Sequence, residues 1–218
     1  TLTVAAVSVA PVISASPGNS AFVEGNNVTS TPVVVDGGIT VTDADSIWLA
    51  SATVRITSGF QGGQDVLAFT NNGTSMGDIT ASYNAGSGVL TLTSSGGTVT
   101  VAQWQAALRA VTYTNTSDTP NTADRTISFA VNDGISVSNA GTKTVSVAAV
   151  NDSPIVTVNG GTTAFTEGNN VTSTPVLIDS AITLSDRDNS TLSSATVSIT
   201  GNFQSSQDVL AFTSSGDI

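Results

Sequence analysis

Apolar and polar residues alternate along much of the chain with a period of two. Val, Ile, Leu or Phe occupies every second position of these runs, and Thr or Ser lies between them. This alternation is typical of β-strands with one buried and one solvent-facing side. Gly, Asn, Asp and Ser separate the runs and indicate tight turns. We therefore predict strands at 38–43, 52–57, 65–70, 88–93, 111–114, 125–131 and 143–150.

One segment has the spacing of a helix. Val101, Trp104 and Leu108 recur at intervals of three and four residues, and Thr100 with Gln103 has the pattern of a capping box. We predict a helix of two to three turns whose apolar stripe, Trp104 included, packs in the core. Many short strands with one short helix are the pattern of an all-β protein, a Greek-key β-sandwich.

The sequence contains a long internal repeat. Residues 1–70 align without gaps with residues 144–213, at an offset of 143, and about 40 of the 70 positions are identical. We expect residues 1–11 to be the closing strand of a preceding repeat plus a linker, 12–154 to be a complete repeat, and 155–218 to be the first half of the next. The chain therefore reads as part of a tandem array of sandwiches.

The composition narrows the possible functions. The chain has five Lys and Arg residues and 16 Asp and Glu residues, which gives a formal net charge of −11. This negative charge argues against binding to nucleic acid or to anionic membranes. The absence of Cys and His excludes disulfides, thiolate zinc sites and catalysis by thiol or imidazole. No apolar stretch approaches the length of a membrane helix, so we expect no direct membrane insertion. Zero Cys also fits a bacterial secreted or surface protein.

The acidic residues have a distinctive distribution. Fourteen of the 16 are Asp, and Asp43/Asp45 and Asp186/Asp188 form pairs two residues apart at strand ends. In an extended segment both carboxylates of a pair face the same way, and they repel each other unless a cation lies between them. Ca²⁺ prefers such oxygen ligands. The alternative is that each Asp only makes a turn through hydrogen bonds to its own backbone.

Several motifs together resemble a known family. Val150-Asn151-Asp152-Ser153-Pro154 looks like the linker between the cadherin-like repeats of giant bacterial surface and RTX-type adhesins. Thr42-Asp43-Ala44-Asp45 resembles the cadherin Asp-x-Asp signature, residues 129–134 its acidic turn, and Phe22-Val23-Glu24-Gly25 its first-strand glutamate. The resemblance covers the entire chain and implies cadherin-like or immunoglobulin-like sandwich repeats, calcium binding, and an extracellular location on a bacterial surface.

The resemblance also implies a set of metal ligands. At the junction after the complete repeat these are Glu24, Asn151, Asp152, Asp186 and Asp188, and at the earlier junction they are Asp43, Asp45 and Asp133. This chain departs from the family at Ala149, where animal cadherins have another Asp, and at Ser8-Val9-Ala10, which replaces Asn151-Asp152-Ser153. We therefore expect no cluster of three Ca²⁺ ions, and we expect the first junction to bind Ca²⁺ weakly or not at all.

The expected function is a non-enzymatic, structural or adhesive module of a long adhesin or filament. Its expected partners are neighbouring repeats or copies of itself, and any surface or glycan ligand is unknown. The alternative is a carbohydrate-binding or carbohydrate-active sandwich, which would need paired acids in a cleft with aromatic platforms, but aromatic residues make up only 5 % of the chain.

Trp48 either caps its own sandwich or contacts a neighbouring chain. The incomplete repeat after residue 155 should expose an apolar face and unpaired strand edges. We expect those edges and Thr1–Val7 to pair with continuing or neighbouring chain.

Overall fold

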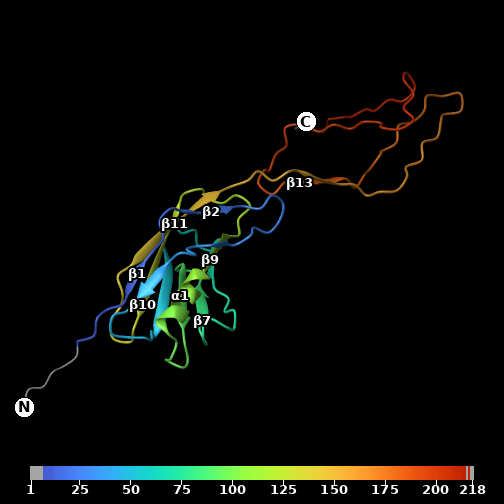
Figure 1. Ribbon diagram of the computed structural model, residues 1–218. Coiled ribbons are helices and arrows are strands. Elements are labelled where there is room, and N and C mark those ends of the chain that lie inside the picture. Colours follow the sequence, from blue (N-terminus) through green and yellow to red (C-terminus); the bar gives the residue numbers. More distant parts are fainter. Residues whose placement is uncertain (1–6, 215, 217–218) are drawn as a thin grey trace, which may run out of the picture. The chain divides into compact units, whose positions relative to one another are not determined.

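The computed structural model describes residues 7–214 and 216. The chain divides into two compact units, Thr1–Ser153 and Pro154–Ile218, called here the first and the second unit. Figure 1 shows their elements. Those of the first unit are β1 (Val12–Ser14), β2 (Ser20–Val23), β3 (Val33–Val34), β4 (Thr40–Thr42), β5 (Ser51–Ser58), β6 (Asp65–Ala68), β7 (Thr80–Asn84), β8 (Val89–Thr93), α1 (Val101–Arg109), β9 (Thr112–Asn115), β10 (Arg125–Asn132) and β11 (Gly141–Ala148).

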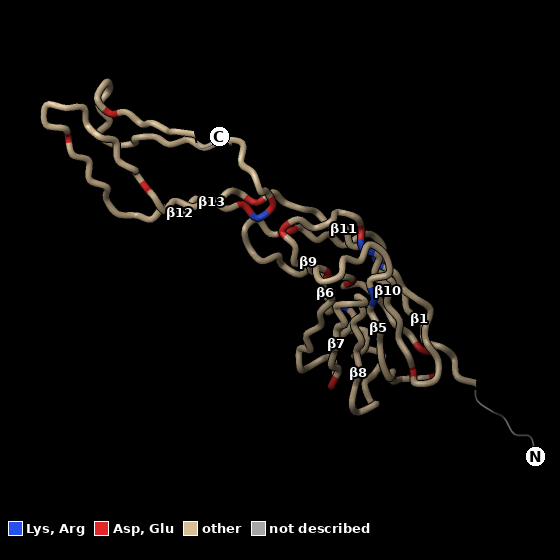
Figure 2. The backbone as a smooth tube through the Cα atoms, turned by 180° about the vertical axis from the view of Figure 1, so that it is seen from behind, with Lys and Arg blue, Asp and Glu red and all other residues tan. Residues whose placement is uncertain are grey.

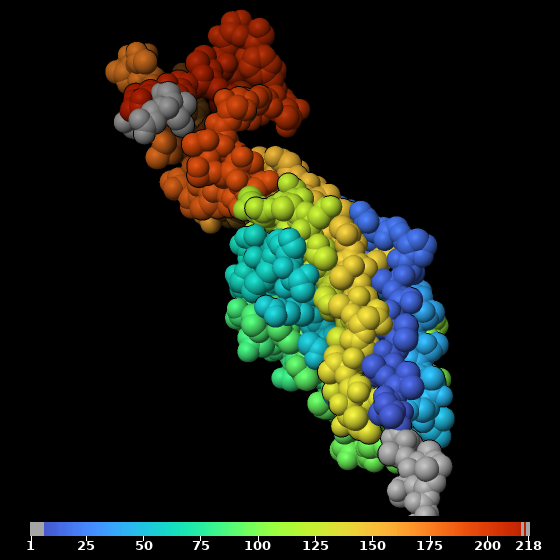
Figure 3. Space-filling view, turned by 90° about the vertical axis from the view of Figure 1, so that its left-hand side faces the viewer, coloured from blue at the N-terminus to red at the C-terminus, as the bar shows by residue number. Residues whose placement is uncertain are grey.

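The strands of the first unit form a large and a small sheet and one separate pair. The large sheet has the order β2-β11-β10-β5-β8-β7, the small sheet has the order β3-β9-β6, and β1 pairs with β4. Neighbouring strands are antiparallel except β2 and β11, which pair in parallel from Ser20/Val145 to Val23/Ala148. The second strand of the unit and its last strand thus lie side by side, as Figure 3 shows for the blue and yellow segments.

The hydrophobic core lies between the large and the small sheet. The inward positions of the strands alternate with exposed ones, as on β5 and β10. Phe22 of β2 meets Tyr113 of β9 edge to face across the two sheets, with ring centroids 5.4 Å apart. Each fully buried aromatic or aliphatic side chain stabilises the fold by about 1.5–3 kcal/mol relative to exposure. The predicted all-β sandwich is confirmed.

The predicted helix is confirmed as α1. Thr100 caps its N-terminus in a capping box with Gln103, and Trp104 is fully buried. The Trp104 indole donates to the Leu49 carbonyl at 2.9 Å, so its polar atom is satisfied inside the core. The Gln105 side chain also accepts from the amide of Val41 at 3.0 Å, which ties the helix to β4. Among the described helices none has the length and apolar character of a membrane span.

The second unit contains one pair of short strands among its described residues. β12 (Ile155–Thr157) pairs with β13 (Thr183–Ser185), and their register repeats that of β1 and β4 at the offset of 143 residues. Most side chains of this unit are exposed. The closing strand expected at Thr1–Val7 falls largely on residues 1–6, which lie outside the described residues.

Candidate metal centre

Glu24 is a buried carboxylate at the end of β2. Its amide donates to the Ala148 carbonyl at 3.0 Å and so extends the pairing of β2 with β11 by one residue. Its carboxylate accepts from the Val150 amide at 3.0 Å. Together these bonds hold Glu24 against the chain as it leaves β11.

The loop after Glu24 encloses residues 151–153. Asn27 adopts a left-handed conformation, with φ of 54°, which Asn tolerates better than most residues. In this conformation its amide donates to the carboxylate of Asp152, and its side-chain nitrogen donates to the Ser153 carbonyl at 2.9 Å. The Asn26 side chain donates to the Asn151 carbonyl at 3.0 Å. Residues 24–27, with the repeated sequence Glu-Gly-Asn-Asn, thus hold the linker through hydrogen bonds.

Three carboxylates meet at this end of the sandwich. Glu24, Asp118 and Asp152 each place one carboxylate oxygen within 4.8 Å of the others. Glu24 and Asp152 are buried, and Asp118, in the loop after β9, is partly buried. The structure therefore brings together two of the residues predicted from sequence. It adds Asp118, which no motif marked, because its loop has no strand alternation and its partners are far away in sequence.

The donor set at this end suits a hard cation. All three acids offer oxygen, and the chain contains no His or Cys that would favour zinc. The side-chain oxygen of Asn27 is also buried and has no hydrogen-bond partner among the described residues. Ca²⁺ takes six to eight such oxygens from carboxylates, amides, backbone and water. The residues present thus fit a Ca²⁺ ion.

Asn151, Asp186 and Asp188 have different surroundings. Asn151 is exposed, and its side-chain nitrogen donates to the Asp152 carbonyl at 2.7 Å. In the second unit, Asp186 accepts from the amides of Asp188 at 3.2 Å and Asn189 at 2.9 Å, which makes a turn. The pKa of Asp186 is lowered, first by a side-chain hydrogen bond with Asp188 and then by these backbone donors.

Asp43 and Asp45 lie at the opposite end of the first unit's strands, after β4. Asp43 makes the same turn as Asp186, because one of its oxygens accepts from the amides of Asp45 at 3.1 Å and Ser46 at 2.9 Å. Its other oxygen is buried without a hydrogen-bond partner among the described residues. Asp45 accepts from the Val9 amide at 2.9 Å.

Asp133 also contacts the segment that precedes β1. Its carboxylate accepts from the Ser8 hydroxyl at 3.2 Å, and the amides of Ser136 and Ile135 lower its pKa. Within the described residues, Asp43, Asp45 and Asp133 form no group as close as Glu24, Asp118 and Asp152. Figure 2 shows the acidic residues mainly at strand ends and in loops.

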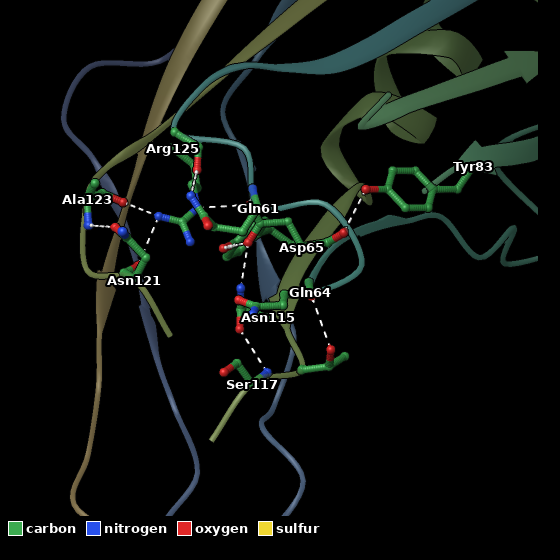
Figure 4. A network of polar contacts seen from close by, with 12 residues as sticks. Gln61, Gln64, Asp65, Tyr83, Asn115, Ser117, Asn121, Ala123 and Arg125 are labelled. Carbon is green, nitrogen blue, oxygen red and sulfur yellow. Dashed lines mark hydrogen bonds and ion pairs between the residues drawn. The ribbon is translucent and has the colours of Figure 1, made fainter. Parts of the chain in front are cut away.

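A second polar centre lies inside the first unit and was not expected from the sequence. Asp65, at the start of β6, is buried, and its carboxylate accepts four hydrogen bonds. Figure 4 shows this network. The donors are the Tyr113 hydroxyl at 2.6 Å, the Asn115 side chain at 2.7 Å, the Gln61 amide at 2.7 Å and the Arg125 guanidinium at 3.0 Å.

Arg125 and Asp65 form an ion pair in which both side chains are fully buried. Arg125 also donates to the carbonyls of Asn121 and Ala123. Burial, followed by the hydrogen bond to Asp65, raises the pKa of Tyr113. Strand periodicity carried a signal for this centre, since Arg125 occupies the same face of β10 as the apolar residues Ile127 and Phe129.

Part of the sequence is similar to a known protein. No family description matches the sequence, and no solved structure matches it. The chain is similar to halomucin of Haloquadratum walsbyi (strain DSM 16790 / HBSQ001), with 41 % identity over 103 residues, which are 46 % of this chain and 1 % of halomucin. The chain thus spans about 1 % of the length of that relative. The similarity does not point specifically to the cadherin-like adhesins.

Proposed function

We propose that this chain is a structural repeat module of a long extracellular surface protein, without enzymatic activity, and that Ca²⁺ stiffens the end of each complete sandwich. The internal repeat and the similarity to a short stretch of halomucin support the array and its surface location. The observation that carries the calcium assignment is the group formed by Glu24, Asp118 and Asp152.

The three acids belong to segments that are distant in sequence. Glu24 follows β2, Asp118 follows β9, and Asp152 follows β11. Two like charges about 4 Å apart repel by about 4 kcal/mol at an effective dielectric constant of 20, and a divalent cation converts that repulsion into attraction. A bound ion would therefore join the two sheets at the point where the chain leaves the sandwich. By holding the segment after β11 in place, a bound Ca²⁺ ion would limit bending between neighbouring repeats of an array.

Calorimetric titration of chelated protein with Ca²⁺ tests the assignment. We expect measurable binding and a higher melting temperature, because an ion bound only by the native state adds about 2.7 kcal/mol to the free energy of unfolding at a hundredfold excess over Kd. Asp118→Asn should weaken binding at least tenfold, since it removes one of three charges. Asp124→Asn, at an exposed carboxylate at the other end of the same β9–β10 loop, is the matched control and should bind like the parent.

Two results would contradict the assignment. One is the absence of binding heat together with an unchanged melting temperature in millimolar Ca²⁺. The other is binding that survives Asp118→Asn but is lost in Asp43→Asn, which would move the ion to the opposite end of the sandwich.

The proposed partners are neighbouring repeats or further copies of the chain. An array of similar units gains stability from each unit and from contacts between neighbours, so it suits a role in spanning distance. Sedimentation velocity of the purified chain over a concentration series distinguishes the two partners. A constant sedimentation coefficient supports repeats joined only along one polypeptide, whereas a concentration-dependent increase supports assembly of copies.

A further inference from the structure

The first unit contains four asparagines in the pattern Asn-x-Ser/Thr, in which x is not proline. They are Asn27-Val28-Thr29, Asn72-Gly73-Thr74, Asn115-Thr116-Ser117 and Asn151-Asp152-Ser153. In an extracellular protein this pattern marks an acceptor for an N-linked glycan, provided that it lies on the surface. The pattern also arises by chance in a chain rich in Asn, Ser and Thr. The surroundings of each side-chain nitrogen therefore decide which of the four asparagines can react.

The side chain of Asn115 is enclosed in the core. The residue is 0 % exposed, and its side-chain nitrogen donates to the buried Asp65 carboxylate at 2.7 Å. A sugar on this nitrogen would have no space and would remove one of the donors to Asp65. The folded chain therefore excludes Asn115 as an acceptor.

Asn27 and Asn151 are held where the loop after β2 meets the linker. The Asn27 side-chain nitrogen donates to the Ser153 carbonyl at 2.9 Å and to the Asn26 side-chain oxygen at 3.2 Å, so both of its hydrogens are engaged. The Asn151 side-chain nitrogen donates to the Asp152 carbonyl at 2.7 Å, and the Asn151 carbonyl accepts from Asn26 at 3.0 Å. An enzyme that draws either segment into its own site would have to break these bonds. The fold therefore disfavours both asparagines as acceptors.

Asn72 has different surroundings, in the loop between β6 and β7. Asn72, Gly73 and Thr74 are all exposed, and a Cβ placed at Gly73 would meet no atom of another segment within 4 Å. The Asn72 side-chain oxygen accepts from the amides of Thr74 and Ser75, each at 3.0 Å, and its nitrogen donates to the exposed Ser75 hydroxyl at 2.8 Å. Water replaces such an exposed bond at a net cost of about 1 kcal/mol. The Asn72 nitrogen is therefore available to a reagent in solvent.

The base of this loop is fixed, so its tip can react without unfolding of the sandwich. The Asn71 side chain donates to the carbonyls of Gly77 and Ile79, both at 2.9 Å, and closes the loop. Met76 is buried and anchors the same loop to the core. These contacts leave the three residues of the pattern outside the packed part of the first unit.

We propose that Asn72 is the acceptor for an N-linked oligosaccharide, transferred from a donor in which a lipid carries the sugar through a phosphate. A bond forms between Asn72 Nδ2 and the anomeric carbon of the sugar, and the bond from that carbon to the phosphate oxygen breaks. The phosphate leaves with the electron pair, and Nδ2 releases one proton. The proposal rests on the extracellular location in the proposed function and is independent of calcium.

A glycan at Asn72 would also affect the large sheet. The loop leads directly into β7, which is an edge strand of that sheet. An exposed edge strand offers unpaired backbone groups to other strands, and β7 contains no Lys or Pro that would oppose such pairing. A hydrated sugar beside this edge would hinder pairing with a strand of another molecule.

The test incubates the purified, folded full chain with a single-subunit oligosaccharyltransferase and a lipid-linked oligosaccharide. Peptide mass spectrometry measures the rate of modification at each asparagine, relative to a synthetic peptide that spans the same pattern without the fold. Asn72 should react about as fast in the folded chain as in its peptide. Asn27 and Asn115 should react at least about tenfold more slowly than in their peptides, because they become accessible only through local opening.

Two variants of the full chain test the acceptor pattern itself. Thr74→Ala should abolish modification of Asn72, because it removes the hydroxyl of the pattern. Ser75→Ala is the matched control, at the neighbouring exposed residue outside the pattern, and should be modified like the parent. An unchanged melting temperature shows that both variants fold.

Three results would overturn the proposal. The first is an unmodified Asn72 in the folded chain although its peptide is modified. The second is an equal relative rate at Asn72 and Asn115 in the folded chain, which would remove the argument from burial. The third is a loss of modification in Ser75→Ala as complete as in Thr74→Ala. Because the reaction uses purified protein, failure of the extracellular location would leave these outcomes unaffected.

Discussion

Removing the buried charge of Arg125 is the sharpest test of how the first unit is held together. Arg125→Met keeps most of the side-chain volume but leaves the Asp65 carboxylate fully buried without its counter-charge. Removing one partner of a buried ion pair costs about 3–5 kcal/mol. Domains are stable by only about 5–15 kcal/mol, so the loss is a large fraction of the total. It corresponds to a melting temperature lower by about 6–20 °C at 2–4 °C per kcal/mol.

The matched control is Arg55→Met. Arg55 lies on β5 beside β10, but its side chain is exposed, so the free energy of unfolding should change by less than about 0.5 kcal/mol. Asp65→Asn should also be strongly destabilising, because it leaves the guanidinium without a counter-charge. The double variant with Arg125→Met should cost at least about 2 kcal/mol less than the sum of the single variants, since neither charge then remains unpaired.

Urea unfolding followed by tryptophan fluorescence measures these differences. Both tryptophans of the chain, Trp48 and Trp104, belong to the first unit, so the signal reports on that unit alone. The slope of the transition should stay constant if only stability changes. A loss below about 1 kcal/mol for Arg125→Met, or one equal to that of Arg55→Met, would refute the reasoning.

Two further predictions concern alkaline pH and a glycine. Because the pKa of Tyr113 is raised in the folded state, its hydroxyl ionises at lower pH in the unfolded chain than in the folded one. The free energy of unfolding should therefore be unaffected by this group below pH 10 and should decline as the pH rises above it. Tyr113→Phe should reduce that decline in unfolding curves recorded from pH 9 to 11. Gly59 and Gly63 both have positive φ, but only at Gly59 would a Cβ overlap the Asp124 carbonyl. Gly59→Ala should therefore lower the free energy of unfolding by at least about 1 kcal/mol more than Gly63→Ala in thermal melts, and equal losses would contradict this.

Seven of the first unit's eleven described strands, the helix and several turns could be predicted from the sequence, because they depend on neighbours a few residues away, whereas β1, β2, β3 and β7 were not predicted. Period-two alternation gave β5, β8 and β10, and the capping box gave the start of α1. The two copies of the repeat show this dependence directly. The amide of Asp45 donates to Asp43 at 3.1 Å, and the amide of Asp188 donates to Asp186 at 3.2 Å. These contacts form in both units, although the surroundings differ.

The two polar centres depended on the tertiary structure. Asp118 reaches Glu24 and Asp152 only because the strands that precede these three residues end at the same end of the sandwich. Asp65 and Arg125 are 60 residues apart, and their pairing requires β6 and β10 to begin at neighbouring points of two facing sheets. No local pattern of residues encodes such a distance.

Burial was also decided by the tertiary structure. Phe22 and Phe165 occupy matching positions in the repeat, yet one is enclosed and the other is exposed. The sequence by itself determined which side chains are apolar and on which side of a strand they lie. Their burial requires partner strands contributed by segments distant along the chain, because a sheet is closed only by hydrogen bonds and packing between such segments. In the first unit the segment from β7 to β11 provides those partners.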